Sequence, residues 1–255
     1  MNILVTNDDG VQATGLLALA QEMRKLGKVT VFAPDKNWSA SGHVKTMERP
    51  LRVREVLLAD GTTAYSSDGA PSDCVALPLL GLIEDQIDLV VSGINPNANL
   101  GHDVTYSGTV TAAMEAVIAG VRGMAVSLDS PEGYKGLLDY SCAASVARRV
   151  AQQVLKDDLP DGVVVNVNVP FLSENQLKGF MITRQGLRVY RDALDERVDP
   201  RGKPYYWIGG EAPTGVDEPG TDFGALRAGY VSITPLQLDL THYKAMDILK
   251  KWDFE

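Results

Sequence analysis

The chain has 255 residues, of which 45% are hydrophobic and 22% charged, so it is long and apolar enough to bury one large core. Its formal net charge of −9 excludes a general nucleic-acid binder, because such proteins hold phosphate backbones with Lys and Arg. No apolar run approaches the roughly 20 residues of a membrane-spanning helix, and the N-terminal segment has no basic leader. We therefore expect a cytoplasmic protein with no membrane partner.

Short apolar runs alternate with helical stretches in the first half of the chain, which predicts an α/β domain with a mainly parallel sheet and helices on both faces. The predicted strands are 3–6, 28–33, 87–92, 124–128, 163–169 and 230–234, and a hairpin joins 51–58 to 62–66. The predicted helices are 16–26, capped by Gly27, and then 71–83, 108–119, 141–156 and 243–252. Cys74 and Cys142 lie far apart in apolar surroundings, so we expect two reduced core residues.

The segment 184–229 differs from the rest of this single domain, 1–255. It is rich in charges, glycine and proline, and it carries an aromatic cluster at Tyr205, Tyr206 and Trp207. Aromatic side chains together with mixed charge are typical of subunit interfaces. We therefore expect an arm that projects from the core and contacts another subunit, and a flexible surface insertion is the alternative.

Three polar loops follow predicted strands, and ligands of open α/β sheets bind beyond the carboxyl ends of the strands. In the first loop, Asp8 and Asp9 come directly after the strand 3–6. Two adjacent carboxylates repel each other, and a divalent cation between them would allow both to ionise. The alternative is that one Asp caps the following helix while the other is solvated.

The second loop, 34–43, offers hydroxyls and an amide around Ser39, and taken alone it is better explained as an ordinary surface loop. The third loop carries Asn95 and ends in Ser107-Gly108-Thr109 at the head of a helix. Free N–H groups and the positive dipole end make such a helix start suitable for a phosphate. Ser107 would cap that helix in either case.

The combined donor set of the three loops consists of carboxylate, hydroxyl and amide oxygens, which suit Mg, Mn or Ca better than soft metals. The three histidines show no zinc spacing, and the chain lacks a Walker A motif, a Gly-x-Gly-x-x-Gly after the first strand and a Gly-x-Ser-x-Gly elbow. A haloacid-dehalogenase-type nucleophile would fall on Asn7, whose amide cannot form an acyl phosphate. Attack by a metal-activated water is therefore favoured over a phosphoenzyme.

Longer motifs surround these residues, in the order Ile3-Leu-Val-Thr-Asn-Asp-Asp-Gly10, Ala33-Pro-Asp35, Asp68-Gly-Ala-Pro-Ser-Asp-Cys74, Ser92-Gly-Ile-Asn95, Asn99-Leu-Gly-His-Asp-Val-Thr-Tyr-Ser-Gly-Thr-Val110, Ile182-Thr-Arg-Gln-Gly186 and Val231-Ser-Ile-Thr-Pro-Leu236. Together they resemble the stationary-phase survival protein SurE family over nearly the whole chain. One departure lies beside Ser39, where Trp38 and Ala40 stand in place of the Arg and Gly that are common in the family. That departure puts the substrate preference in doubt and leaves the metal ligands in place.

The resemblance implies a Rossmann-like, three-layer α/β/α fold with a C-terminal oligomerisation extension, and a homodimer or homotetramer made by exchanging C-terminal elements. It also implies hydrolysis of nucleoside 5'- and 3'-monophosphates with one divalent cation per subunit, Mg or Mn. The implied metal ligands are Asp8, Asp9, Ser39 and Asn95, and the implied phosphate-binding residues are Asn95, Ser107, Gly108 and Thr109.

For the catalytic step we expect Asp9 to act as the base, with Asp8 as the alternative. Two rival functions use the same pocket. One is a non-catalytic nucleotide sensor, and the other is a phosphatase that prefers short polyphosphate or another phosphomonoester.

Overall fold

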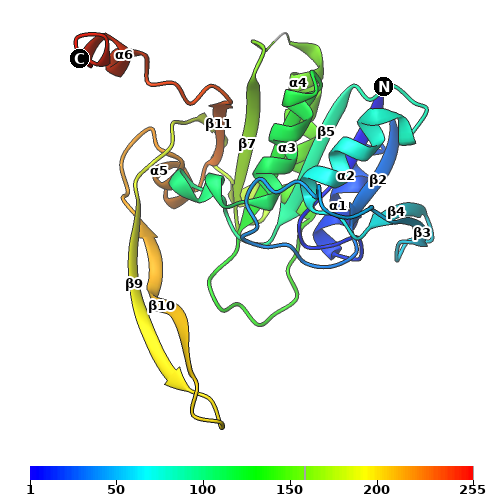
Figure 1. Cartoon of the computed structure of the whole chain (residues 1–255). Coiled ribbons are helices and arrows are strands. Elements are labelled where there is room, and N and C mark those ends of the chain that lie inside the picture. Colours follow the sequence, from blue (N-terminus) through cyan, green and yellow to red (C-terminus); the bar gives the residue numbers. More distant parts are fainter. Residues whose placement is uncertain (158, 255) are drawn as a thin grey trace.

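A nine-stranded sheet forms the centre of the computed structural model, which describes residues 1–157 and 159–254, and its strand order is β3-β4-β2-β1-β5-β6-β7-β11-β8 (Figure 1). β4, β2, β1, β5, β6 and β7 are mutually parallel, whereas β3 at one edge and the β11-β8 pair at the other run against them. The strands are β1 Asn2–Thr6, β2 Lys28–Pro34, β3 Val53–Leu57, β4 Thr63–Ser67, β5 Leu89–Asn95, β6 Arg122–Asp129, β7 Val163–Pro170, β8 Phe180–Ile182 and β11 Val231–Gln237. The prediction of a mainly parallel α/β sheet is confirmed.

Helices cover both faces of the sheet and give three layers. α1 (Thr14–Met23) and α4 (Ser141–Lys156) pack on one face, and α2 (Pro71–Leu77) and α3 (Gly108–Ile118) pack on the other. Because successive side chains of a strand point to opposite faces, Ile3 and Val5 of β1 join the core under α1 and α4, whereas Leu4 joins the core under α2 and α3. The short helices are η1 Pro78–Leu82, η2 Gly101–Thr105 and η3 Glu174–Gln176.

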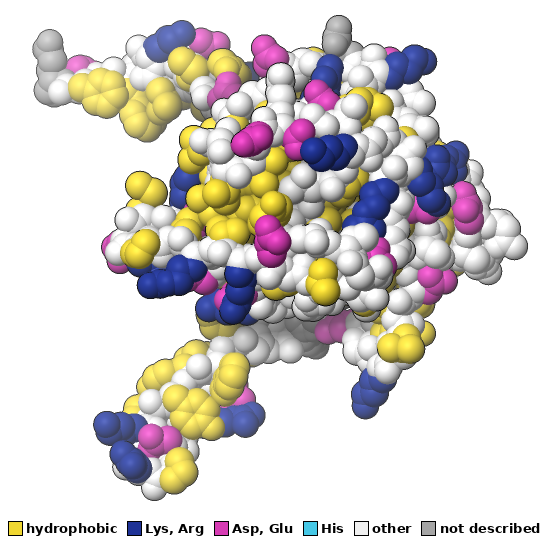
Figure 2. All heavy atoms as spheres, turned by 90° about the vertical axis from the view of Figure 1, so that its right-hand side faces the viewer, with side chains coloured by type: hydrophobic (Ala, Val, Ile, Leu, Met, Phe, Trp, Pro, Cys, Tyr) yellow, Lys and Arg dark blue, Asp and Glu magenta, His cyan; other side chains and the backbone are white. Residues whose placement is uncertain are grey.

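An antiparallel hairpin of β9 (Arg188–Val198) and β10 (Pro204–Gly215) extends away from the body of the molecule (Figure 1). Hydrophobic side chains remain exposed along it, among them Leu194, Trp207 and Ile208 (Figure 2). The chain then returns to the body, where Phe223 and Leu226 of α5 (Asp222–Arg227) pack against Leu100. Within the segment 184–229 it is therefore the hairpin that projects.

Several predicted boundaries were wrong. α1 ends at Met23 rather than at residue 26, and Gly27 does not cap it. Gly27 lies against the start of β1, where an added Cβ would come within 2.3 Å of the Met1 carbonyl oxygen. β5 begins two residues later than predicted and continues through Asn95, and the C-terminal helix α6 spans Tyr243–Leu249.

Both cysteines are buried and unbonded, as the sequence predicts: Cys74 lies on α2 and Cys142 lies on α4. Among the described residues, no helix combines the length and the apolar character that a bilayer crossing requires.

Candidate functional site

The three polar loops meet at one edge of the sheet because they leave neighbouring parallel strands. β1 lies between β2 and β5, with Val5 beside Val31 and Thr6 beside Ser92. The first loop therefore lies in the middle, the Ser39 loop leaves β2 on one side, and Asn95 ends β5 on the other. α3 begins at the same edge, because Gly108 contacts the side chain of Asp8.

Asp8 is held rigidly against the start of α3. Its side chain is buried, and its Oδ1 accepts a hydrogen bond of 2.6 Å from the Thr109 hydroxyl. Gly108 leaves no room for a side chain, since an added Cβ would lie 2.8 Å from the Asp8 Cβ and 3.0 Å from Oδ2. Burial raises the pKa of Asp8, and the Thr109 hydrogen bond lowers it in part. The close approach places one carboxylate at the positive end of a helix.

Asp9 is the more strongly perturbed carboxylate. Burial, and next to it the charge of Asp8, raises the pKa of Asp9 to about 7. The Asn37 amide approaches its Oδ1 at 3.5 Å. An ordinary Asp ionises near pH 4, so holding both charges together at neutral pH costs free energy unless a cation offsets their repulsion.

A tight turn shapes the first loop and places the two carboxylates. The Asn7 side chain accepts from the Gly10 N–H at 3.2 Å and donates to the Gly10 carbonyl at 3.0 Å. Gly10 has a φ of 106°, a conformation that favours glycine. The side chain of Asn7 is thus committed to the turn, which agrees with the exclusion of a nucleophile at that position.

The Ser39 loop is joined to the first loop through the backbone. The Trp38 N–H donates to the Asp8 carbonyl at 2.7 Å, and the Ser39 N–H donates to the Asn37 side-chain oxygen at 2.7 Å. Ser39 itself is exposed. The first of these hydrogen bonds ties the backbone next to Ser39 to the backbone of Asp8.

Asn95 reaches the edge as the last residue of β5, three residues beyond the Ser92–Thr6 pair. Its amide nitrogen donates to the Asn97 carbonyl at 2.5 Å, which orients the side chain and uses neither the amide oxygen nor the second N–H. Ser107 accepts from the Val110 N–H at 3.1 Å and caps α3, as its sequence position predicts. The cap satisfies the Val110 N–H, and the Thr109 N–H bonds to the Asp8 carboxylate, so an anion at this helix start would use the N–H groups that precede them.

The donor chemistry of this edge fits a hard divalent cation. Among residues 1–157 and 159–254, no group of three or more His, Cys, Asp or Glu side chains could hold a metal ion. A cation here would therefore depend on the mixed set of Asp8, Asp9, Ser39 and Asn95, which supplies oxygen ligands. The raised pKa of Asp9, caused first by burial and then by the charge of Asp8, favours this fit, since a bound cation would stabilise the ionised form against both.

Sequence reasoning missed the groups that support the site. The Thr109 hydroxyl was assigned no role, although it is the direct partner of Asp8. Asn99 attaches the loop after Asn95 to the neighbouring strands β6 and β7. Its side-chain amide donates to Ser127 Oγ at 2.8 Å, and its backbone N–H donates to Asn168 Oδ1 at 2.8 Å. Alternating Asn in an otherwise apolar strand, as in β7, was the available signal.

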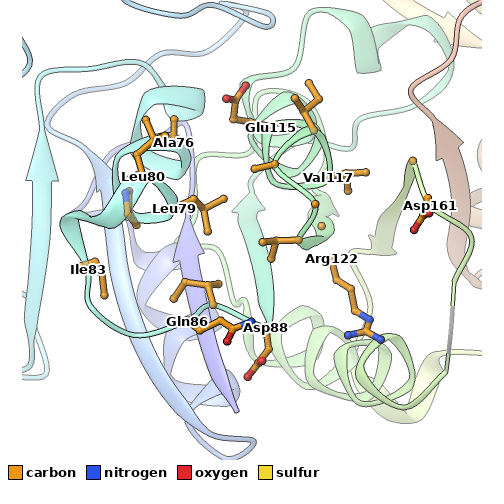
Figure 3. A pocket seen from close by; sticks show the side chains of 18 of the residues that line it. Ala76, Leu79, Leu80, Ile83, Gln86, Asp88, Glu115, Val117, Arg122 and Asp161 are labelled. Carbon is orange, nitrogen blue, oxygen red and sulfur yellow. The ribbon is translucent and has the colours of Figure 1, made fainter.

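A large groove lies at the other end of the parallel strands. This groove of about 1430 Å³ is lined by residues that precede β5, β6 and β7, together with η1 and the end of α3 (Figure 3). Leu79, Asp88, Arg122 and Asp161 line it. Since parallel strands bind their ligands at the opposite, carboxyl ends, the groove is separate from the carboxylate site.

Comparisons with known proteins agree with this layout. The family model of the survival protein SurE matches residues 3–192. The 5'-nucleotidase SurE of Herpetosiphon aurantiacus is 55% identical over 242 residues, 95% of this chain and 94% of the relative. The 5'-nucleotidase SurE of Chloroflexus aggregans is 48% identical over the full length of both chains. The crystal structure of the SurE protein from Aquifex aeolicus superposes with a TM-score of 0.82 at 39% identity and covers 98% of each chain.

Proposed function

The chain belongs to the SurE survival protein family, and from this premise we propose that it releases phosphate from nucleoside 5'- and 3'-monophosphates with one bound divalent cation, Mg or Mn. The observation that supports this most strongly is the pair Asp8 and Asp9 after β1, of which Asp8 packs against the start of α3 and accepts a hydrogen bond from the Thr109 hydroxyl. Relatives named 5'-nucleotidase share about half of the residues of this chain.

The proposed reaction is direct hydrolysis. Bound to Asp8, Asp9, Ser39 and Asn95, a divalent cation would supply Lewis acidity to the phosphate and lower the pKa of a water molecule. Asp9 would accept the proton from the water as its oxygen bonds to phosphorus and the bond to the sugar oxygen breaks. The leaving sugar oxygen then takes a proton from solvent. Asp8 is fixed by Thr109 and would keep the arrangement rigid.

The phosphoryl group would be held at the start of α3. Backbone N–H groups of Ser107 and Gly108, together with the second N–H of the Asn95 amide, are the proposed donors, whereas the Thr109 N–H, which was expected among them, is bonded to Asp8. Such preorganised donors stabilise charge that grows on the transferring group and need no reorganisation during reaction. The acidic chain as a whole repels phosphate, so this local cradle and the cation are what allow binding.

Phosphate release from a panel of nucleoside 5'- and 3'-monophosphates tests the proposal. We expect release with Mg or Mn and loss of release in excess chelator, measured by a colorimetric phosphate assay. Short polyphosphate and simple phosphomonoesters belong in the same panel, because faster release from them would replace the proposed substrate. Nucleotide-dependent thermal stabilisation without any release would contradict the enzyme and favour a sensor.

We also propose that the β9–β10 hairpin contacts a second copy of the chain in a homodimer or homotetramer. Leu194 is 70% exposed and Ile208 is 86% exposed, which is costly for a hairpin that stays in water. Light scattering at micromolar concentration is expected to give a mass at least twice that of the 27.5 kDa chain. Replacing Ile208 by Asp should lower that mass, and a monomeric wild-type protein would contradict the proposal.

A cytoplasmic location remains part of the proposal. Its support is the pair of buried, unbonded thiols Cys74 and Cys142, which suits a reducing compartment.

A further inference from the structure

Glu115 is a buried carboxylate that the catalytic proposal does not use. It lies on α3, two turns beyond the phosphate-facing start of the helix, and only 7% of its surface is exposed. Its neighbours Ala112, Ala113 and Ala116 are apolar and fully buried. Figure 3 shows the side chain leaving α3 at the rim of the groove. A charged group in such a place requires partners.

Both partners of Glu115 come from the segment that follows Ser39. The Lys45 ammonium donates to its Oε1 at 2.7 Å, and His43 Nε2 lies 3.0 Å from its Oε2. Burial opposes the charge on Glu115, but the hydrogen bonds from Lys45 and His43 outweigh it and hold the pKa of the carboxyl below its usual value. Glu115 is thus a charged anchor point for a loop that leaves β2.

Two further contacts attach the same segment to the region of α3. The Gly42 N–H donates to the Tyr106 carbonyl at 2.9 Å, and the Thr111 hydroxyl, whose shortest acceptor is the Ser107 carbonyl at 2.8 Å, also lies 3.1 Å from the Gly42 carbonyl. Ser107, Thr111 and Glu115 are spaced four residues apart and therefore lie on one face of the helix. That face carries the helix cap at one end and the loop anchor at the other.

The Ser39 loop is also attached where it leaves β2, through the Asp35 N–H to the Ser67 carbonyl at 2.7 Å, and beyond Lys45, through the Thr46 N–H to Asp73 Oδ1 at 3.0 Å, so the part between Asp8 and residue 42 is the least supported. Residues 35–37, Ser39 and Ala40 are exposed, and Ala40 has a φ of 57°, which is unusual for a residue with a side chain. The loop is joined to Asp8 through the Trp38 N–H and to α3 through residues 42–45. Its path across the site is therefore fixed from its two ends.

We propose that Glu115 is a positioning residue of the phosphatase site, which holds the loop 34–47 through His43 and Lys45 so that Ser39 faces the cation site beside Asp8. The inference rests on the proposed function. Glu115 touches neither substrate nor cation, and it acts by preorganising one ligand. Loss of the anchor leaves the carboxylates and the start of α3 in place and lets Ser39 move away from them.

The test compares Glu115→Ala with Glu22→Ala. Glu22 of α1 is a matched control, because its carboxylate also binds two cations, Lys25 and Arg148, at a place remote from the site. Both variants are expected to fold, since alanine favours helices and the side chains of His43 and Lys45 are 32% and 49% exposed and can be solvated. Circular dichroism checks the fold.

Three readouts are measured on the full chain. Mn²⁺ affinity by electron paramagnetic resonance is expected to fall about tenfold in Glu115→Ala, the range typical for losing a group that orients a ligand. Hydrogen exchange at the Gly42 amide should become faster, with or without metal. At saturating Mn²⁺ and nucleotide, kcat should stay within about threefold of wild type. Glu115→Gln keeps an acceptor for Lys45 and should restore part of the Mn²⁺ affinity.

Unchanged Mn²⁺ affinity and exchange in Glu115→Ala, or equal changes in Glu22→Ala, would overturn the inference and leave the proposed function standing. Wild-type protein that binds no Mn²⁺ and releases no phosphate would overturn the proposed function, and this inference with it.

Discussion

Asp9→Asn is expected to lower kcat for nucleotide hydrolysis by about a thousandfold, within the range that a lost general base accounts for. The amide keeps an oxygen that can ligate a cation, but it cannot accept the proton of the attacking water. The same change should not destabilise the metal-free protein. Burial and Asp8 raise the pKa of Asp9 to about 7, so at pH 8 the folded state carries an unfavourable charge that the amide removes.

The experiment measures kcat with saturating Mn²⁺ and, separately, the melting temperature in excess chelator at pH 8. Activity should fall while the melting temperature stays constant or rises, a pair of signs that a merely misfolded variant cannot give. Asp85→Asn is the matched control, because Asp85 pairs with Lys28 at the distant edge of the sheet. An Asp9→Asn enzyme within tenfold of wild-type kcat would transfer the role of base to Asp8.

The sequence was sufficient to predict the sheet because each central strand is short, apolar and followed by a polar loop. Parallel strands end at the same edge of a sheet, so the sequence alone predicts that Asp8 and Asn95 lie at one edge. The bounds of α4 were predicted to the residue, since its apolar positions repeat with a helical period and its exposed face is charged.

Tertiary contacts decided what the sequence could not. Gly27 has the local features of a helix cap, yet its lack of a side chain is needed against the Met1 carbonyl. The segment 184–229 reads as one polar insertion, but Phe223 of α5 packs into the body. Sequence patterns show how residues are spaced along the chain, whereas both of these contacts join residues that are far apart in sequence.

The same limit applies to the site. The proposed ligands Asp8 and Asp9 could be named from their position after a strand, whereas the Thr109 hydroxyl bonds to a residue 101 positions away. Glu115 in a run of alanines signals a buried charge, but its partners His43 and Lys45 follow only from how the Ser39 loop crosses α3. Side chains that orient ligands are therefore harder to predict than the ligands.

Gly108→Ala is expected to lower kcat/KM at least about a hundredfold, because moving a reacting group by about 1 Å can have this effect. The new Cβ would lie 2.8 Å from the Asp8 Cβ, closer than two carbon atoms can approach. Asp8 cannot turn aside freely, since it is buried and bonded to Thr109. Either the carboxylate or the start of α3 must therefore move, and both belong to the proposed site.

Gly209→Ala gives the matched control, since its added Cβ would meet the Ala193 carbonyl oxygen at an ordinary 3.7 Å on the hairpin. Steady-state kinetics and thermal melts of both variants separate displacement from unfolding. Alanine is favoured over glycine inside a helix by about 0.5–1 kcal/mol, which offsets part of the strain at position 108, so the melting temperature should change far less than the activity. Full activity in Gly108→Ala would mean that Asp8 can shift without consequence, and the rigid contact between this carboxylate and α3 would then have no part in catalysis.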